Sequence, residues 1–328
     1  MIARPAVGNA RDALPAEHAA WARTPERSNR LLLRVMTWIS LRMGRRAGRV
    51  ILHFIAAYFL LFAPGSRRAS RDYLRRVLRR EPRWRDLYRH FHTFAATIHD
   101  RVYLVNHRFD LFDIEVHGEA LLQRLLANGN GLFLLGAHHG SFEVIRALGR
   151  GHANLRVAMV MHDGNAQKIS SMLAAINPHA ARDIIALGHV DSMLKVSKFL
   201  DDGGAVGMLA DRTPGNDPLH AVPLFGADVA LPTGPFRMAA LLRRPVVFMT
   251  GLYLGGNRYA IHFEALADFS ATPRAERPAA LEAAIARYAA LLEHYCRLAP
   301  YNWFNFFDFW PASPSDAPSP PSGMPLAP

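Results

Sequence analysis

His138 and Glu143 are the residues whose types and spacing best suit catalysis. They lie in the segment 136–143, GAHHGSFE, which begins at the last residue of the apolar run 131–136. When a carboxylate holds one nitrogen of an imidazole, the other can accept a proton, and such general-base assistance is typically worth about 10² to 10⁴ in rate. Residues five apart do not share a helix face. We therefore expect a tight turn through Gly140 to bring the two side chains together.

Ser141 is the only obvious nucleophile of this segment. It can cap a helix that begins at Phe142, which would place Glu143 in the first helical turn. Because capping occupies the Ser141 hydroxyl, we expect His138 to act on a substrate hydroxyl rather than on a protein nucleophile. A second hypothesis is a metal-dependent hydrolase that uses His138, His139 and Glu143, although the side chains of adjacent histidines generally point apart.

The amino-acid composition limits the possible partners and excludes two kinds of cysteine site. The chain has 328 residues, 50% of them hydrophobic, and a formal charge of +12. Such a surplus needs a negative partner, which can be nucleic acid, anionic lipid or an acidic protein. Cys296 is the single cysteine, so an internal disulfide and a zinc-binding cysteine cluster are both excluded. We expect no metal ion and no cofactor.

An apolar segment and a basic segment follow one another near the N-terminus. Apolar residues dominate 31–64, but the run 50–63 would span only about 21 Å as a helix, short of the ~30 Å hydrocarbon core. We expect an in-plane or hairpin anchor; a buried core helix is the alternative. Ten arginines and three acids follow in 67–89 at helical spacing. They predict a basic amphipathic helix on an anionic membrane surface, with no nucleic acid as partner, because no recognition motif is present. A non-enzymatic basic membrane or nucleic-acid binder is a third hypothesis.

The rest of the chain alternates between strand-like and helix-like stretches. We predict an α/β fold, a central mixed or parallel sheet flanked by helices, with a membrane-anchoring helical segment before it. The expected organisation is a mobile N-terminus over 1–28, an anchor and basic helical region over 29–105, a catalytic domain over 106–310 and a disordered tail over 311–328. The predicted strands are 131–136, 156–161, 183–186, 205–210, 245–253 and 259–263, and the predicted helices are 120–127, 142–148, 165–175, 190–200, 233–242 and 281–298.

The sequence resembles the late acyltransferases of lipid A biosynthesis, within the lysophospholipid acyltransferase superfamily. Their signature, H-x-x-x-x-[DE] after a hydrophobic strand, matches His138 and Glu143. Four further segments resemble the family in the same order: 207–212 (GMLADR), 222–226 (VPLFG) with 232–235 (PTGP), 243–247 (RRPVV) and 299–304 (APYNWF). The resemblance spans roughly residues 31–310 and implies a glycerolipid acyltransferase-like fold.

The resemblance also implies a reaction and a site. A fatty acyl group would pass from an acyl thioester, acyl carrier protein or acyl-CoA, to a hydroxyl of a lipid A-type acceptor at the cytoplasmic face of the bacterial inner membrane. His138 would take the hydroxyl proton while Glu143 holds its tautomer, and N–H groups at 141–143 would steady the oxyanion. The residues expected to bind substrate are Ser141, Asp211, Arg212, Phe225, Gly226, Thr233 and Gly234.

Two departures from the lipid A enzymes leave the acceptor open. The chain continues as NFFDFWP over 305–311, without the basic residues that commonly follow the closing tryptophan. The stretch 161–165 lacks an arginine expected among lipid A members. An acyltransferase for another lipid or a lipid-linked pigment is therefore an alternative. The aromatic residues at 303–310 suit either the edge of the core or an interfacial lipid contact.

Overall fold

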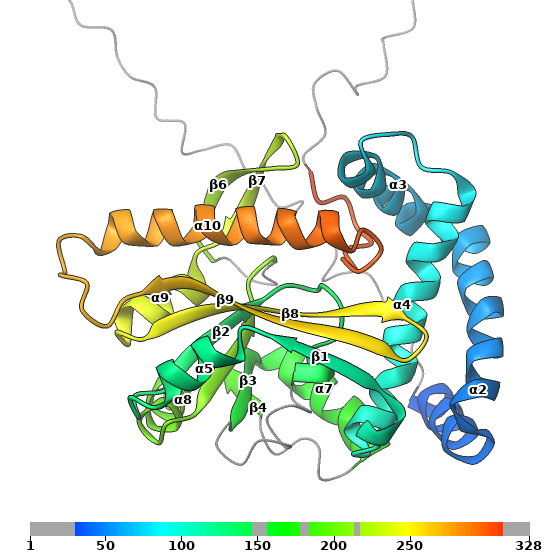
Figure 1. Ribbon diagram of the computed structural model, residues 1–328, viewed down its shortest axis with the longest axis horizontal. Helices are drawn as coiled ribbons and strands as arrows, with labels where there is room; N and C mark the ends of the chain where they lie inside the picture. Colours follow the sequence, from blue (N-terminus) through cyan, green and yellow to red (C-terminus); the bar gives the residue numbers. More distant parts are fainter. Residues whose placement is uncertain (1–29, 146–155, 178–183, 213–216, 311–328) are drawn as a thin grey trace, which may run out of the picture.

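A seven-stranded sheet forms the centre of the described part of the chain in the computed structural model (Figure 1). The structure describes residues 30–145, 156–177, 184–212 and 217–310. The predicted mobile N-terminus and disordered tail lie outside these residues. The strands, in spatial order, are β1 (Asp113–His117), β9 (Arg258–Asp268), β8 (Pro245–Gly255), β2 (Leu132–Gly136), β5 (Ala205–Leu209), β3 (Val157–His162) and β4 (Ile184–Leu187).

The sheet is mixed and mostly parallel, as predicted. Strands β8, β2, β5, β3 and β4 run in one direction, and the antiparallel β8–β9 pair reverses it for β9 and β1. The five parallel strands therefore end at one common edge, which is where α/β proteins place ligands. The six predicted strands are all present, with β9 running five residues beyond the predicted end. The sequence analysis missed β1 and a separate antiparallel hairpin, β6 (Leu219–Leu224) with β7 (Ala227–Pro232).

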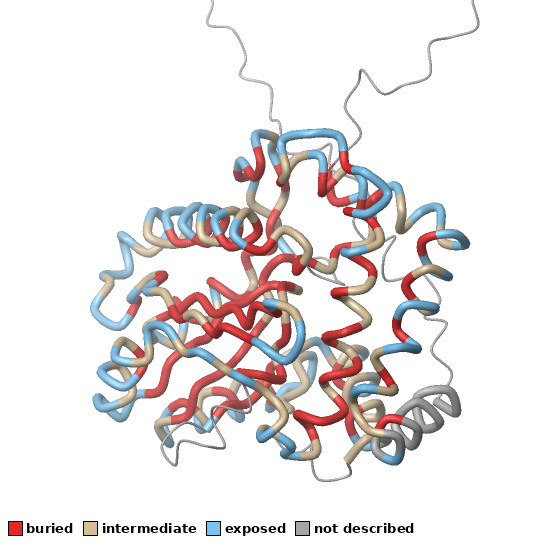
Figure 2. The backbone as a smooth tube through the Cα atoms, turned by 45° about the vertical axis from the view of Figure 1, so that its right-hand side comes forward, coloured by how far each residue is buried: buried red, intermediate tan, exposed pale blue. Residues whose placement is uncertain are grey.

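Helices cover both faces of the sheet, which explains the nearly continuous apolar runs of the central strands. In β2, Phe133 and Leu135 pack into the cluster that contains α9 and α10, while Leu132 and Leu134 pack into the cluster with α5. Each such fully buried side chain stabilises the fold by about 1.5–3 kcal/mol, and buried residues concentrate along the strands (Figure 2). The helices here are η2 (Phe109–Leu111), α5 (Glu119–Leu126), α7 (Asp163–Ile176), α8 (Ser192–Asp201), α9 (Gly234–Leu241) and α10 (Arg277–Leu298).

Within the described residues, three further helices precede the sheet: α2 (Arg30–Phe62), α3 (Pro64–Leu78) and α4 (Trp84–Val105). Helix α2 is broken at Gly44, whose φ of 79° is not helical, and its second part lies beside α4 (Figure 1). The prediction of one basic helix over 67–89 was wrong, because the chain turns between α3 and α4. Arg79 adopts a left-handed conformation there, and Pro82 cannot sit inside a helix without removing a hydrogen bond.

A membrane-spanning helix is not found among the described residues. No single helix there is both long enough and apolar enough to cross a bilayer. Gly44–Phe62 and Pro64–Leu78 meet that test of length and composition only as a pair, and their axes are bent by 96°.

Candidate active site

His138 stands at the carboxyl edge of the sheet because of the strand pairing on either side of it. Strand β2 pairs in parallel with β5, and Gly136 lies opposite Leu209. Two residues beyond the ends of these strands, His138 and Asp211 face each other. The Gly136 carbonyl is fixed by the Tyr288 hydroxyl of α10 at 2.8 Å and by the N–H of Ala210 at 2.9 Å. The backbone that leads into His138 is therefore held from two sides.

Asp211 binds His138 twice. Its Oδ1 accepts a hydrogen bond from the ring Nδ1 at 2.8 Å, and its Oδ2 accepts one from the backbone N–H at 3.0 Å. The side chain of Asp211 is fully buried, whereas that of His138 is 28% exposed. With Nδ1 donating to the carboxylate, the ring must present its other nitrogen, Nε2, as the proton acceptor.

Burial and the nearby charges together favour a neutral imidazole beside an ionised carboxylate. Burial is the main cause that lowers the pKa of His138, the charge of Arg212 lowers it further, and Asp211 opposes both. Burial alone would raise the pKa of Asp211, but the side-chain and backbone hydrogen bonds from His138 and the charge of Arg212 hold it well below its ordinary value. A base that stays unprotonated next to an anionic orienting group is the arrangement that general-base catalysis needs.

The turn after His138 is tight, as predicted, and it is built on Gly140. Gly140 has a φ of 70°, and a Cβ at this position would lie 2.0 Å from the carbonyl oxygen of Gly251. Its N–H donates to the carbonyl of Asn302 at 2.8 Å, and the Ser141 N–H donates to that of Gly251 at 2.8 Å. A helix then begins at Phe142, as expected. Since the Ser141 N–H already donates within the protein, it is removed from the predicted oxyanion donors.

Glu143 does not stand where the sequence placed it. The carboxylate at Nδ1 of His138 belongs to Asp211, while Glu143, which is 6% exposed, lies with Oε1 3.8 Å from Nε of Arg101 on α4. The physical reason is that the left-handed turn at Gly140 directs the new helix towards α4, whereas strand pairing brings Asp211 alongside the histidine. The charge of Arg101 in turn contributes to lowering the pKa of His138, after burial and Arg212.

Asp211 and Arg212 are close to His138, as the prediction of a shared site requires. Arg212 donates from Nη1 to Oδ1 of Asn305 at 3.3 Å, and its guanidinium lies 5.5 Å from the centre of the Phe307 ring. Asn305 in turn donates to Asp211 at 3.1 Å. Asp211 and Arg212, which are neighbours in the sequence, are thus linked by hydrogen bonds through the side chain of Asn305.

Four other predicted substrate-binding residues, Phe225, Gly226, Thr233 and Gly234, make contacts within the fold, and none of these contacts is with His138. Phe225 and Gly226 form the tip of the β6–β7 hairpin, both with positive φ, and the Phe225 N–H donates to Glu293 of α10 at 2.7 Å. Thr233 and Gly234 begin α9, but the Thr233 hydroxyl donates to the carbonyl of Pro218 at 3.0 Å. A Cβ on Gly234 would lie 3.3 Å from Oδ2 of Asp217, so a carboxylate of the chain itself already lies at this helix start.

His139 is buried in the protein interior, and its side chain contacts Thr250. It is 3% exposed, and Nδ1 lies 2.8 Å from the hydroxyl of Thr250. Burial lowers the pKa of His139 to about 3, so the ring is neutral. Within the described residues, no group of three or more histidine, cysteine, aspartate or glutamate side chains is arranged to hold a metal ion. The geometry therefore gives no support to a metal centre on His138, His139 and Glu143.

The closing aromatic segment contributes to the site in a way that the sequence did not reveal. Trp303 is fully buried and donates from Nε1 to Oδ2 of Asp211 at 3.0 Å. Phe309 and Trp310 are each 7% exposed, which favours the core edge over an interfacial lipid contact for these two residues. The resemblance had singled out this segment, but nothing in its spacing indicated that Trp303 and Asn305 would reach a carboxylate more than 90 residues earlier in the chain.

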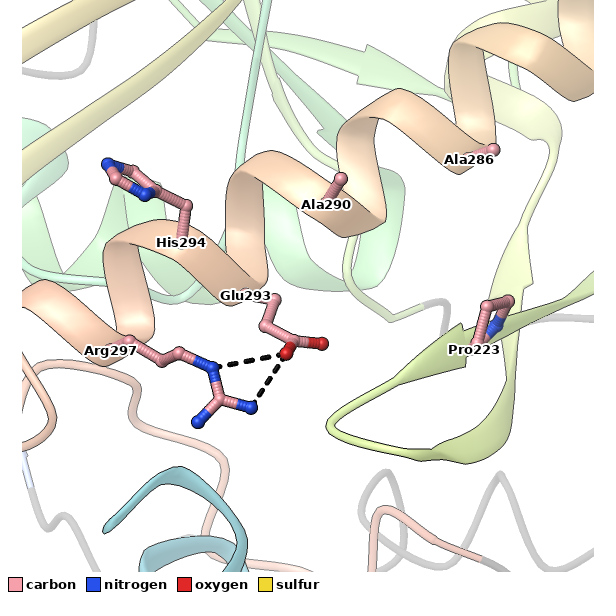
Figure 3. Close-up of a pocket in the computed structure, with 6 residues that line it drawn as sticks. All are labelled: Pro223, Ala286, Ala290, Glu293, His294 and Arg297. Atoms are coloured by element: carbon pink, nitrogen blue, oxygen red, sulfur yellow. Dashed lines mark hydrogen bonds and ion pairs between the residues drawn. The ribbon is translucent and has the colours of Figure 1, made fainter. Parts of the chain in front are cut away.

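A surface groove elsewhere is separate from this site. It lies between α10 and the β6–β7 hairpin and is lined by Pro223, Ala286, Ala290, Glu293, His294 and Arg297 (Figure 3). Glu293 pairs with Arg297 at 2.7 Å and also accepts the hydrogen bond from the hairpin tip. These contacts fasten the hairpin to the helix, and none of the lining residues was predicted to be functional.

The geometry can be set beside known proteins. No match to the chain is found among curated proteins. The model of one family, bacterial lipid A biosynthesis acyltransferase, matches residues 21–311, which include every described part of the site. The chain therefore belongs to the bacterial lipid A biosynthesis acyltransferase family, and it is an acyltransferase.

Proposed function

We propose that this acyltransferase moves a fatty acyl group from an acyl thioester to a hydroxyl of a lipid acceptor, with His138 as general base. The main support is the His138–Asp211 pair, in which a buried carboxylate engages Nδ1 of a ring that remains 28% exposed. A positioned base of this kind typically contributes about 10² to 10⁴ in rate. The alternative of a metal-dependent hydrolase has no comparable group of ligands among the described residues.

The transfer needs no nucleophile from the protein. Nε2 of His138 removes the proton from the acceptor hydroxyl as its oxygen attacks the thioester carbonyl carbon. The tetrahedral intermediate then collapses, the carbon–sulfur bond breaks, and the imidazolium returns the proton to the departing thiolate. The products are an ester and a free thiol. Because helix N-termini present unpaired N–H groups, the backbone N–H groups of Phe142 and Glu143 are the candidates to stabilise the oxyanion.

Two arginines supply positive charge beside the base. Arg212 follows Asp211, and Arg101 projects from α4 towards Glu143; the charges of both contribute to lowering the pKa of His138, after burial. Anionic groups occur in both substrates that the family suggests: the phosphopantetheine of acyl carrier protein or of acyl-CoA, and the phosphates of a lipid A-type acceptor. We assign to Arg101 and Arg212 the binding of these anionic groups. Another lipid or a lipid-linked pigment is the alternative acceptor.

Membrane attachment at the cytoplasmic face of the bacterial inner membrane is proposed through α2. One side of this helix is a row of exposed apolar residues at helical spacing: Val50, Phe54, Tyr58, Leu61 and Phe62, exposed by 48–72%. We call it the α2 apolar row. Exposed arginines of α3, including Arg68, Arg71 and Arg75, follow directly along the chain. Apolar residues next to cationic ones suit a helix lying in the plane of an anionic membrane.

Mass spectrometry of the products tests the chemistry. The full chain is incubated with a fatty acyl carrier protein and an extract of bacterial glycolipids. We expect a mass increase of one acyl chain on a lipid, its loss with His138→Ala, and no effect of a chelator. His117→Ala is the matched control, since His117 is half-exposed at the end of β1, which runs opposite to β2. Acyl transfer by His138→Ala at the wild-type rate would refute the mechanism, and loss of activity with chelator would favour the metal-dependent alternative.

Vesicle binding tests the membrane contact. Phe54→Glu places a charge in the α2 apolar row and should reduce co-sedimentation with anionic vesicles by at least tenfold, because burying that charge in lipid is unfavourable. Leu194→Glu on α8 is the matched control, since Phe54 and Leu194 are each 72% exposed. Equal binding by the two variants would show that α2 is not the contact.

A further inference from the structure

The second oxygen of Asp211 has three hydrogen-bond donors, and two of them come from the closing segment. Besides the backbone N–H of His138, Oδ2 accepts from Nε1 of Trp303 at 3.0 Å and from Nδ2 of Asn305 at 3.1 Å. The carboxylate is fully buried, so these donors replace the water that would otherwise solvate it. The orientation of the group that holds His138 thus depends on residues near the end of the described chain.

Trp303 is itself fixed by contacts on both sides of its backbone. Its carbonyl oxygen lies 2.8 Å from Nε2 of His90 on α4, and the following N–H, that of Phe304, donates to the carbonyl of His138 at 2.8 Å. Burial lowers the pKa of His90 to about 4, so the ring is neutral near pH 7. A neutral ring that donates from Nε2 must accept at Nδ1, where the hydroxyl of Ser70 lies 2.8 Å away.

The tryptophan ring has no freedom to turn away from the carboxylate. Trp303 is fully buried, and its ring meets those of Tyr73, Phe225, Phe309 and Trp310 edge-on or tilted, with centres 4.7–6.3 Å apart. Close packing of this kind restricts a side chain to one rotamer. The indole N–H is therefore presented to Asp211 in one direction.

We propose that Trp303 is a positioning residue for acyl transfer, because its indole N–H fixes Asp211 and, through Asp211, the ring of His138. This inference rests on the proposed function of His138. The aromatic surroundings of Trp303 alone would require only a large ring at this position. The hydrogen bond to the carboxylate gives the N–H a separate role, and that role can be removed without removing the ring.

Trp303→Phe tests this role, and Trp310→Phe is its matched control. Both tryptophans are buried in the same segment and both donate from Nε1, but Trp310 donates to the carbonyl of Leu224. We expect Trp303→Phe to lower kcat on the order of tenfold, the effect of one lost hydrogen bond, with KM unchanged. If Trp303→Phe fails to fold, 3-benzothienylalanine at position 303 keeps the ring shape and replaces the N–H with sulfur.

A titration provides the readout that packing alone would not change. The charged groups that act on His138 are Asp211 and Arg212 after β5 and Arg101 on α4, and Glu143 lies beside Arg101. Without the Trp303 N–H, Asp211 keeps more negative charge at Oδ1, so the pKa of His138 should rise in nuclear magnetic resonance titrations of ¹⁵N-labelled histidine. Equal kcat and equal titration in the two variants would overturn the proposal. Since the titration requires no turnover, a wild-type protein that transfers no acyl group would contradict the proposed function separately.

Discussion

His138 and Asp211 lie level with each other across the β2–β5 pairing, each two residues beyond the paired Gly136 and Leu209. The contact that defines the site is therefore a consequence of sheet register. A slip of one residue between these strands would turn one of the two side chains to the opposite face of the sheet. The apolar residues of β2, buried on both faces, oppose such a slip because it would transfer each of them into the wrong layer.

Asp211→Asn should reduce kcat on the order of 10³-fold or more, as loss of the orienting carboxylate does in related base–carboxylate pairs. The three donors at Oδ2 would fix the asparagine with its oxygen there and its NH₂ towards His138. The ring would then have to accept at Nδ1 and carry its proton at Nε2, where it could not act as a base.

Glu143→Gln is the matched comparison for this variant. It weakens the ion pair between Glu143 and Arg101 but leaves the hydrogen bond between Asp211 and His138 intact. Its loss in kcat, measured with the same substrates, should be at least about tenfold smaller than that of Asp211→Asn. If Glu143→Gln were the more damaging change, the orienting role would return to Glu143.

The pH dependence of kcat/KM should reflect the lowered pKa of His138. Burial, followed by the charge of Arg212, favours the neutral ring, so the protein should keep its base active below the ordinary imidazole pKa of about 6.5. Arg212→Gln removes one cause of the lowering and should move the acid limb of the profile to higher pH. An acid limb unchanged in that variant would contradict the electrostatic role assigned to Arg212.

The described fold was largely predictable because its strands are buried on both faces. Short continuous apolar runs such as 131–136 and 205–210 are typical of parallel strands that helices cover on either side. The β6–β7 hairpin was missed for a local reason: its turn places Phe225, a bulky residue, at a positive φ of 52°, and Pro223 and Pro232 lie within its strands. Both features argue against a hairpin from sequence alone.

The site was predictable only where it depends on neighbouring residues in the chain. The strand end, the turn at Gly140 and the helix start at Phe142 are local, and the sequence located them. The partner of His138 depends on which strands pair, and no local spacing indicates that β2 lies beside β5. For this reason the nearest acid in sequence, Glu143, was assigned the role that Asp211 has in the structure.

Gly140→Ala should be far more damaging than Gly129→Ala. Both glycines have a φ of 70°, so the backbone strain of an alanine is the same, but a Cβ at Gly129 meets no atom within 4 Å. At Gly140 the Cβ would overlap the carbonyl of Gly251, and such overpacking typically costs about 1–3 kcal/mol. The difference is measurable as the free energy of unfolding from denaturant curves, with acyl transfer assayed in parallel. Equal stability of the two variants would mean that the turn at Gly140 is looser than its contacts indicate.

Asp100→Asn should destabilise the chain far more than Asp72→Asn, because Asp100 belongs to a buried ion cluster and Asp72 to an exposed one. Asp100 is fully buried and binds Arg45 and Arg49 of α2, each at 2.8 Å, whereas Asp72 on α3 binds two arginines at the surface and is 33% exposed.

Leaving two largely buried arginines without their counter-charge should destabilise the chain by about 3–5 kcal/mol, while Asp72→Asn should cost about 0–1 kcal/mol.

Burial would raise the pKa of Asp100, but His99 and the two arginines hold it below its ordinary value. A folded-state pKa below the unfolded one gives stability that is complete above the ordinary carboxyl value of about 4 and is lost as the pH falls through the lower, folded-state value. The difference in the free energy of unfolding between wild type and Asp100→Asn should therefore be largest near pH 7 and should shrink only in strong acid. A difference that did not change with pH would show that the carboxylate charge is not what holds α2 against α4.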